Sequence, residues 1–332
     1  MTAPANIAPG GSPAATTDAG AKIRRLIPGP KQGAIVALIV LVLLNALFTP
    51  NFATTSNLVN VLLQVSTVLL VAVGMTMVLA TGGVDLSVGS AMAVAAAVAG
   101  VLLDGGTPVV VAILAALGAA LAMGLLNGVL ISRFRVQPIV ITLATLIGGR
   151  GLAQIISRDG ELITIHDPAF AAIGRGSLLG LPIQTLIALA VVVGVTFLLR
   201  ATPFGRYVLS VGGNRAAARL AGVKVKTTIV MVYAGCALLA GLAGLVEASR
   251  LGASDAAKIG LGMELDAIAA AVVGGTLLTG GRATIPGAVV GALIMQVIAT
   301  SFNMLLIPYS WSLALKAGII LFAVWLQRPA RV

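Results

Sequence analysis

The sequence lacks most of the residues on which soluble enzymes depend. Charged residues make up 9% of the chain and aromatic residues 4%, and there is one cysteine, Cys236, and one histidine, His166. A single cysteine cannot form an internal disulfide, and a histidine without companion ligands completes neither a metal site nor a catalytic triad. No His-Glu-x-x-His, Gly-x-Ser-x-Gly or Walker A motif occurs, so a protease, a lipase or an ATPase within this chain is unsupported. We expect neither catalytic residues nor a metal site.

Apolar residues dominate the chain instead. They make up 59% of it and the mean hydropathy is +1.09, whereas about a quarter of the residues of a soluble domain are charged. The apolar runs cover 33–48, 57–81, 87–103, 108–132, 138–156, 181–199, 229–247, 264–281, 284–304 and 309–326. These runs are longer than a barrel strand of ~10 residues and close to the ~20 residues of a transmembrane helix. The sequence predicts an all-α polytopic membrane protein of about ten transmembrane helices.

Basic residues predict how these helices are oriented. Residues 1–32 are rich in Pro, Ala, Gly, Ser and Thr, which predicts a disordered tail. Lys22, Arg24, Arg25 and Lys31 lie at its end, directly before the first apolar run. With the amino terminus inside, most other basic residues also fall on inner segments, as the positive-inside rule requires. We expect both termini in the cytoplasm, and we assign the net charge of +11 to topology and to contact with membrane lipids rather than to nucleic acid.

Two similar glycine-containing stretches each join one apolar run to the next. TGGVDLSVG, from Thr81 to Gly89, and TGGRATIPG, from Thr279 to Gly287, share Thr-Gly-Gly and a later glycine. Glycines break helices, and a broken helix is tolerated at membrane depth only where protein or a water-filled cavity surrounds its backbone. We expect a helix break at each stretch. The carboxylate of Asp85 then either caps the next helix or shapes a gate at the inner mouth of a pathway.

Uncharged polar residues form stripes on two of the predicted helices. The first stripe consists of Asn57, Asn60, Gln64 and Thr67, and the second of Gln296, Thr300 and Asn303. Their spacing by three or four residues places each set on one helical face. Amides and hydroxyls of this kind suit a neutral, polyhydroxylated solute. They also form ordinary hydrogen bonds between helices, and the sequence leaves both interpretations open.

The long basic connection 200–228 contains a predicted short helix. Asn214 is a favourable N-cap and Gly222 a favourable stop, and Arg215 and Arg219 are four residues apart on one face. Two turns of helix are not stable in isolation, so this helix needs a surface to dock against. A cytoplasmic partner protein and anionic lipid headgroups are the two candidates.

Three stretches carry a resemblance to a known family. They are GGVDLSVGS from Gly82, FGRYVLSVGGNRAAARLAGVKV from Phe204, and ELDAIAAAVVGGTLLTGGRATIPGAVVGALI from Glu264. In order and spacing the chain from about 57 to 327 resembles the permease subunits of bacterial ABC sugar importers of the ribose, xylose and galactose type, in the branched-chain amino-acid permease superfamily. One departure is Arg282 with Ala283, where relatives often have Gly-Lys-Gly or Gly-Arg-Gly.

The resemblance implies roles for particular residues. Residues 33–328 would form the transmembrane permease domain, with 200–228 as its cytoplasmic coupling loop, and the two polar stripes would line the substrate pathway. The residues that couple to an ATPase would be Gly205, Arg206, Gly212, Gly213, Asn214, Arg215, Ala218, Arg219, Leu220 and Gly222. The signature motif or gate would comprise Gly82, Gly83, Asp85, Leu86, Ser87, Gly89, Thr279, Gly280 and Gly281.

The resemblance also implies partners. Permeases of this family lie in the bacterial inner membrane, pair as dimers, and work with a cytoplasmic ATPase and a periplasmic sugar-binding protein. ATP and magnesium would bind the ATPase, and this chain would need no cofactor of its own. We therefore expect a homodimeric permease subunit that imports a pentose or hexose by alternating access and is not itself an enzyme.

An ion-coupled secondary transporter is the main alternative, and an ABC permease for another small solute such as an amino acid is the second. A secondary transporter usually buries ionisable coupling groups near the middle of its helices. The apolar runs here offer mainly Lys316, Glu264 and Asp266. This scarcity favours an external source of energy.

Overall fold

The computed structural model describes residues 30–326, with side chains placed at all of these except 30–32, 309, 320 and 322–326. Each of the ten predicted apolar runs contains a helix. In chain order these are α2 (Pro30–Phe48), α3 (Thr55–Ala80), α4 (Val88–Asp104), α5 (Val109–Phe134), α6 (Pro138–Ile156), α8 (Ile183–Ala201), α11 (Val225–Leu251), α12 (Met263–Val273), α13 (Ile285–Met304) and α14 (Tyr309–Leu326). The predicted tail, 1–32, lies outside the described residues except for its last three positions, which belong to α2.

Six of these helices are long and apolar enough to cross a membrane: α3, α5, α6, α8, α11 and α13. Shorter apolar helices are present in α2 and α4. Large apolar side chains cover the outside of the bundle, since Leu43 of α2, Ile147 of α6 and Phe197 of α8 are 57%, 68% and 66% exposed. So many exposed apolar side chains are unusual on a surface that faces water, but they are typical of a surface that faces lipid. The predicted all-helical polytopic membrane architecture is confirmed.

Short elements occupy the connections in the described part of the chain. The helices are α7 (Pro168–Arg175), α9 (Pro203–Gly213) and α10 (Arg215–Leu220). Strand β1 (Ile163–Thr164) pairs antiparallel with β4 (Ala253–Ser254), and β2 (Ser177–Leu178) pairs antiparallel with β3 (Leu181–Pro182). Of these elements the sequence predicted only α10.

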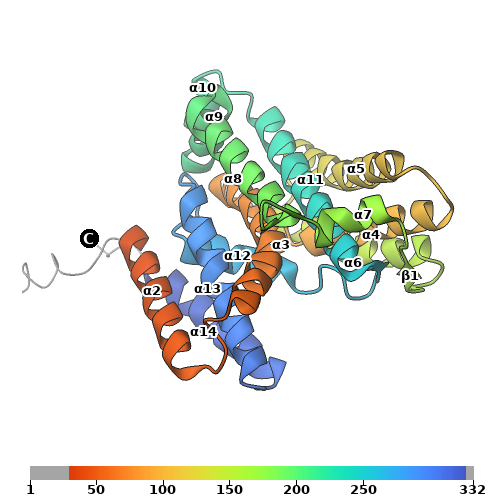
Figure 1. Cartoon of the computed structure of the whole chain (residues 1–332). Coiled ribbons are helices and arrows are strands. Elements are labelled where there is room, and N and C mark those ends of the chain that lie inside the picture. Colours follow the sequence, from red (N-terminus) through yellow and green to blue (C-terminus); the bar gives the residue numbers. More distant parts are fainter. Residues whose placement is uncertain (1–29, 327–332) are drawn as a thin grey trace, which may run out of the picture.

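The helices form two groups joined by α3. One group has α11 packed against α5 and α4, with α6 against α4, and the other has α13 packed against α12 and α2, with α14 against α12. α3 contacts α11, α12 and α13 and is the most buried of the six spanning candidates. Figure 1 shows α9 and α10 together at one end of α8, while α7 lies toward its other end. The connection that contains α10 is therefore separated from the one that contains α7 by the length of a helix.

Glycines allow α11 to approach its neighbours closely. A Cβ on Gly124 of α5 would lie 2.6 Å from the Tyr233 carbonyl oxygen, and a Cβ on Gly128 would lie 2.7 Å from the Cα of Val230. On the other side of α11, Gly244 lies against the backbone of Met92 in α4. Close approach of backbones is a main source of helix association in membranes, where the hydrophobic effect does not drive helices together.

The break predicted between the second and third helices is present. α3 ends at Ala80 and α4 begins at Val88. Gly82 has a φ of +74°, in the left-handed region that side chains rarely adopt. The chain therefore turns at this glycine before α4 begins.

The second predicted break begins earlier than the sequence indicated. The apolar run 264–281 is not one helix, because α12 ends at Val273 and α13 begins at Ile285. Gly275, Gly280 and Gly281 have φ values of +88°, +88° and +78°, and none of these is compatible with a right-handed helix. Hydropathy alone did not show where the helix stops, because the glycines lie in an otherwise apolar run.

The connection between α11 and α12, predicted only as the gap between two apolar runs, is partly buried. Its residues Ala256 and Ile259 are fully buried, and Gly252, Gly260 and Gly262 have positive φ. Arg150 of α6 holds this segment, since its Nη1 donates to the Ile259 carbonyl at 2.6 Å and to the Ala256 carbonyl at 3.2 Å. A buried segment without helical hydrogen bonds needs such donors for its carbonyls.

Two glycines of α5 provide a matched test of this packing. Gly124→Ala should lower the free energy of unfolding by about 1–3 kcal/mol, because its Cβ would overlap α11. Gly118→Ala should be neutral or stabilise by about 0.5–1 kcal/mol, because nothing lies within 4 Å of its Cβ and alanine is the better helix former. Reversible unfolding of the purified protein in detergent measures both. Equal effects at the two positions would contradict the packing described here.

Candidate functional site

The helix predicted within 200–228 is α10, and its two ends are fixed as the sequence predicted. Asn214 is the N-cap, and its Oδ1 accepts from the N–H groups of Ala216 and Ala217, both at 3.0 Å. At the other end Gly222 has a φ of +81° and its N–H bonds the Arg219 carbonyl at 3.1 Å. The next residue, Val223, donates to the Ala218 carbonyl, which completes a Schellman motif. The six residues of α10 thus keep their helical form through capping.

One side of α10 faces the protein and the other faces outward. Ala218 is 4% exposed, whereas Leu220 is 91% exposed and Arg219 is also exposed. Arg215, although exposed, turns toward the bundle and its Nη2 donates to the Thr81 carbonyl at 3.3 Å. The two arginines that the sequence placed on one face therefore differ: one contacts the protein, and the other is free to contact a partner.

Helix α9 precedes α10 and was missed in the sequence. Thr202 and Pro203 begin it, and its Val208 and Val211 are fully buried. A proline at the first helical position and apolar residues spaced by three and four would have been the signal. Gly205 makes α9 possible, because a Cβ there would collide with the backbone of Leu199 in α8.

Arg206, another of the predicted coupling residues, lies in α9. Its side chain is exposed and forms no hydrogen bond or ion pair within the described residues. Its carbonyl accepts from the Ser210 hydroxyl at 2.7 Å. Gly213 ends α9, and nothing lies within 4 Å of where its Cβ would be. Gly212, directly before it, has a very different environment.

Three glycine-containing segments from distant parts of the sequence meet beside α10. We call this contact the glycine seam; it consists of residues 80–82, 212–213 and 279–281. The Gly281 N–H donates to the Ala80 carbonyl at 2.9 Å. A Cβ on Gly212 would collide with that same carbonyl, and one on Gly280 would lie 2.8 Å from the Gly212 carbonyl oxygen. The two breaks predicted from their shared Thr-Gly-Gly are thus in direct contact with each other and with the end of α9.

The signature aspartate, Asp85, lies in a wholly buried hydrogen-bond network. Its Oδ1 accepts from the Ser87 N–H at 2.9 Å and from the Ser87 hydroxyl at 2.6 Å. The Ser87 hydroxyl accepts from the Asn127 amide of α5 at 2.8 Å, and the Asn127 Oδ1 accepts from the Thr145 hydroxyl of α6 at 2.6 Å. The carboxylate therefore connects the first break to two other helices.

The structure corrects the capping interpretation of Asp85. The residue at the N-cap of α4 is Ser87, and Asp85 bonds the N–H of Ser87 itself rather than the free N–H groups of the first helical turn. Asp85 is 0% exposed, so protein and not water surrounds it. Its Oδ2 has no hydrogen-bond partner within the described residues. In this connection between α3 and α4, burial raises the pKa of the Asp85 carboxyl to about 6, although the two bonds from Ser87 oppose the shift.

The remaining signature residues serve close packing. A Cβ on Gly83 would lie 2.5 Å from the Tyr233 hydroxyl, which donates to the Val84 carbonyl at 3.2 Å. A Cβ on Gly89 would lie 2.7 Å from a carboxylate oxygen of Glu264. Leu86 is half-buried, and Thr279 is exposed at the glycine seam. Glycine at 83 and 89 is thus required by neighbouring atoms.

The two polar stripes meet where α3 crosses α13. The Gln296 amide donates to the Gln64 Oε1 at 3.1 Å and to the Thr300 hydroxyl at 3.2 Å. Thr67, one turn further along α3, is 3% exposed and its hydroxyl has no hydrogen-bond partner among the described residues. The structure thus brings the centre of the first stripe together with the second.

The ends of the stripes differ from each other. Asn57 is used locally, because its Nδ2 donates to the Phe52 carbonyl at 2.8 Å. Asn60 and Asn303 are exposed, one on each helix. Asn57 therefore stabilises the start of α3, whereas Asn60 and Asn303 present free amides at the surface of this chain.

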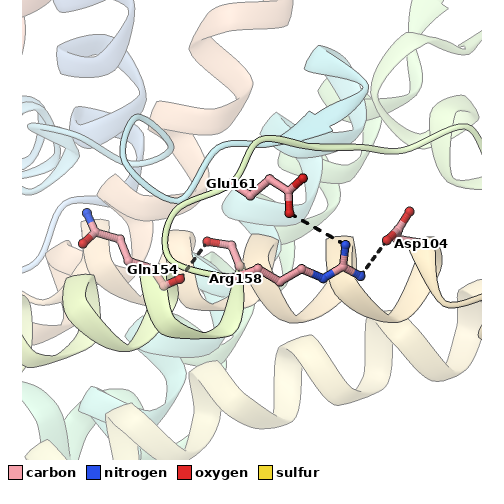
Figure 2. A network of polar contacts seen from close by, with 5 residues as sticks. Asp104, Gln154, Arg158 and Glu161 are labelled. Atoms are coloured by element: carbon pink, nitrogen blue, oxygen red, sulfur yellow. Dashed lines mark hydrogen bonds and ion pairs between the residues drawn. The ribbon is translucent and has the colours of Figure 1, made fainter.

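Exposed ion pairs link the chain segments on the side of the bundle where α7 lies. Arg158, just after α6, donates from Nη2 to Asp104 at the end of α4 at 2.8 Å, and its Nη1 lies 3.8 Å from Glu161, as Figure 2 shows. All three side chains are well exposed, so these pairs contribute little stability. His166 in the same connection is exposed.

Lys316 of α14 and Asp266 of α12 form a close ion pair. The Lys316 Nζ lies 2.7 Å and 2.9 Å from the two Asp266 oxygens, and the lysine side chain is 9% exposed. Each charge is thereby neutralised by the other, as buried charges usually are. Within the described residues no group of three or more His, Cys, Asp or Glu side chains is arranged to hold a metal ion.

Comparison with known proteins identifies the family. Residues 57–324 match the family described as the branched-chain amino acid transport system / permease component. This chain belongs to that family.

Several of its curated relatives are sugar permeases. The chain is 38% identical to the ribose import permease protein RbsC of Escherichia coli strain K12 over 297 residues, 89% of this chain and 92% of the relative. It is 41% identical to the L-arabinose ABC transporter permease protein AraH of Azospirillum brasilense over 303 residues, 91% and 88% of the two chains. It is 36% identical to the galactofuranose transporter permease protein YtfT of Escherichia coli strain K12 over 301 residues, 88% of each. No solved structure matches.

Two substitutions test what Asp85 contributes. Asp85→Ala removes the acceptor of both Ser87 donors and should lower the free energy of unfolding by about 1–3 kcal/mol. Asp85→Asn keeps an oxygen in the same place and should lose less than half as much. Reversible unfolding in detergent compares the two. An Asn variant as unstable as the Ala variant would show that the negative charge, and not the acceptor, is what the network needs.

Proposed function

We propose that this chain is the membrane permease subunit of an ABC importer for a monosaccharide, a pentose or a hexose, and that it works by alternating access. The observation that carries the proposal is the agreement among relatives: permeases named for ribose, L-arabinose and galactofuranose each share 36–41% identity with about nine-tenths of this chain. The family description names branched-chain amino acids, but the match to sugar permeases extends over almost the whole of both proteins.

The chain is a multi-pass protein of the bacterial inner membrane and is a transport subunit rather than an enzyme. ATP and magnesium are assigned to a separate cytoplasmic ATPase, and delivery of the sugar to a periplasmic binding protein. We assign the helices of all ten apolar runs as spans, six of which are long and apolar enough to cross a membrane as continuous helices, with both termini in the cytoplasm and α10 on the cytoplasmic side. The positive-inside distribution of the basic residues supports this orientation.

Helix α10 is the proposed contact with the ATPase. Its outer side presents Leu220 with Arg219 beside it, and a leucine that is 91% exposed next to a basic residue suits a groove in a partner protein. Anionic lipid headgroups would pair with the arginine, but the polar headgroup layer would offer the leucine no apolar contact. The partner protein is therefore the preferred of the two candidates left open by the sequence.

The substrate pathway is assigned to the side of the chain where α3 meets α13. Asn60 and Asn303 present free amides there, next to the hydrogen-bonded pair of Gln64 and Gln296. A polar surface on a membrane protein is costly unless water or protein covers it. A second copy of the chain facing this surface would enclose a pathway lined by uncharged donors and acceptors, which supports the homodimer.

The ion-coupled alternative loses two of the three candidates named from the sequence, Lys316 and Asp266. Lys316 and Asp266 neutralise each other in a close ion pair. A residue that carries a coupling proton or cation must instead release and rebind it during the cycle. The pairing therefore fits a structural role and favours an external energy source.

Leu220→Glu tests the proposed contact with the ATPase. Burying a carboxylate where an apolar side chain belongs should weaken binding of the ATPase about tenfold or more, and uptake should fall with it. Arg133→Glu is the control, because Arg133 is an exposed basic residue assigned to the same side but outside α10. Co-purification of the ATPase and radiolabelled sugar uptake measure the effects. Normal binding by the Leu220 variant would exclude α10 as the contact.

Asn60→Leu and Asn303→Leu test the pathway. Each removes one free amide, so uptake should fall by about two- to tenfold while the ATPase remains bound. The control is Gln154→Leu, which removes an exposed amide from α6 on another face. Initial uptake rates in membrane vesicles give the comparison. Unchanged uptake in both asparagine variants would show that these residues do not line the pathway and instead pack against protein or face lipid.

A further inference from the structure

The glycine seam brings the end of the α9–α10 segment into contact with both helix breaks. Gly212 lies between the two: a Cβ there would collide with the Ala80 carbonyl and lie 2.5 Å from the Gly281 nitrogen. The Gly281 N–H bonds that same Ala80 carbonyl, so the two breaks are joined at the point that Gly212 covers. No side chain separates the three backbones here.

The second side of the seam is equally close. A Cβ on Gly280 would lie 2.8 Å from both the Gly212 carbonyl oxygen and the Gly82 nitrogen. Arg215, in the first turn of α10, adds a side-chain link, since it donates to the Thr81 carbonyl at 3.3 Å. α10 is therefore attached to the first break by a hydrogen bond and to both breaks by contact through the last residues of α9.

Backbone-to-backbone contact has a mechanical consequence. Side chains between two elements can change rotamer and absorb a displacement, whereas packed backbone atoms have no such freedom. The break at 81–87 leads directly into α4, and the break at 274–284 leads directly into α13. A displacement of α10 would therefore act on the end of α3 and on both breaks, and through the breaks on α4 and α13.

We propose that the glycine seam is the contact through which displacement of α10 repositions α4 and α13 together, with Gly212, Gly280 and Arg215 as positioning residues of energy coupling. The proposal rests on the proposed function, in which an ATPase displaces α10. It goes further by naming the residues that pass the movement on. α8 and α11 are the covalent routes from this connection. Most of the surface of α8 faces outward, and α11 packs beside α3, α4 and α5, whereas the seam is where the connection touches both breaks.

Two glycines make the test. Gly212→Ala inserts a methyl group into the seam, whereas Gly118→Ala inserts the same group into α5, outside the proposed coupling residues, where nothing lies within 4 Å. The permease, its ATPase and its binding protein are reconstituted together in proteoliposomes, and sugar uptake, ATP hydrolysis and the amount of bound ATPase are measured. The readout is the number of sugar molecules imported per ATP hydrolysed.

For Gly212→Ala we expect the ATPase to remain bound and active. The number of sugar molecules imported per ATP should fall by about two- to thirtyfold, which corresponds to the coupling energies found for mutations between coupled sites. Gly118→Ala should keep the wild-type ratio. A Gly212 variant with the wild-type ratio would overturn the proposal. If the wild-type protein did not bind the ATPase at all, the proposed function itself would be contradicted.

Arg215→Met covers the case in which the Gly212 variant does not fold. It removes the bond to Thr81 without adding atoms to the seam, and the side chain is exposed, so folding should be unaffected. At saturating ATPase the imported sugar per ATP should again fall. An unchanged ratio in this variant would equally overturn the proposal, because it would show that the link between α10 and the first break carries no coupling.

Discussion

Everything in this structure depends on satisfying backbone polar groups where the chain leaves the helical form inside an apolar bundle. A helix in lipid satisfies its own carbonyls and N–H groups, but a break exposes them at a cost of several kcal/mol each. The chain meets this requirement by placing its breaks against other protein atoms: Gly281 bonds the carbonyl of Ala80, and Arg150 bonds carbonyls of the segment before α12. The breaks are stable because other parts of the protein provide hydrogen-bond partners for their backbone groups.

Glycine is what makes these backbone contacts possible. At Gly212 and Gly280 the neighbouring backbone occupies the space of a side chain, and at Gly280 the positive φ also favours glycine. The same requirement recurs along α11, where Gly124 and Gly244 admit other backbones. Contacts of this kind hold the helices and breaks together through backbone atoms, which cannot change rotamer to absorb a displacement. The end of α9, the break at 81–87 and the break at 274–284 form one structural unit for this reason.

Sequence periodicity and composition gave the helices with few errors, and local rules gave α10 completely. Asn214 and Gly222 acted as cap and stop because capping involves only residues near each other in the chain. α9 was missed although its proline and apolar spacing are a local signal, and the other errors lie where local rules do not apply. The run 264–281 was continuous in hydropathy but contains glycines with positive φ, of which Gly280 contacts the distant Gly212. Asp85, for which the sequence left a cap and a gate open, joins a network with Asn127 of another helix.

The sequence by itself determined that the chain lies in a membrane, where its helices fall and to which family it belongs, because hydropathy, capping and motif order are properties of the linear chain. Only the tertiary structure decided that Ala80, Gly212 and Gly281 touch, that Gln64 pairs with Gln296, and that Arg215 turns inward while Arg219 stays outside. Such contacts join residues far apart in the chain, and their geometry depends on how whole helices pack. No local pattern specifies that packing, since small residues permit close approach without naming the partner.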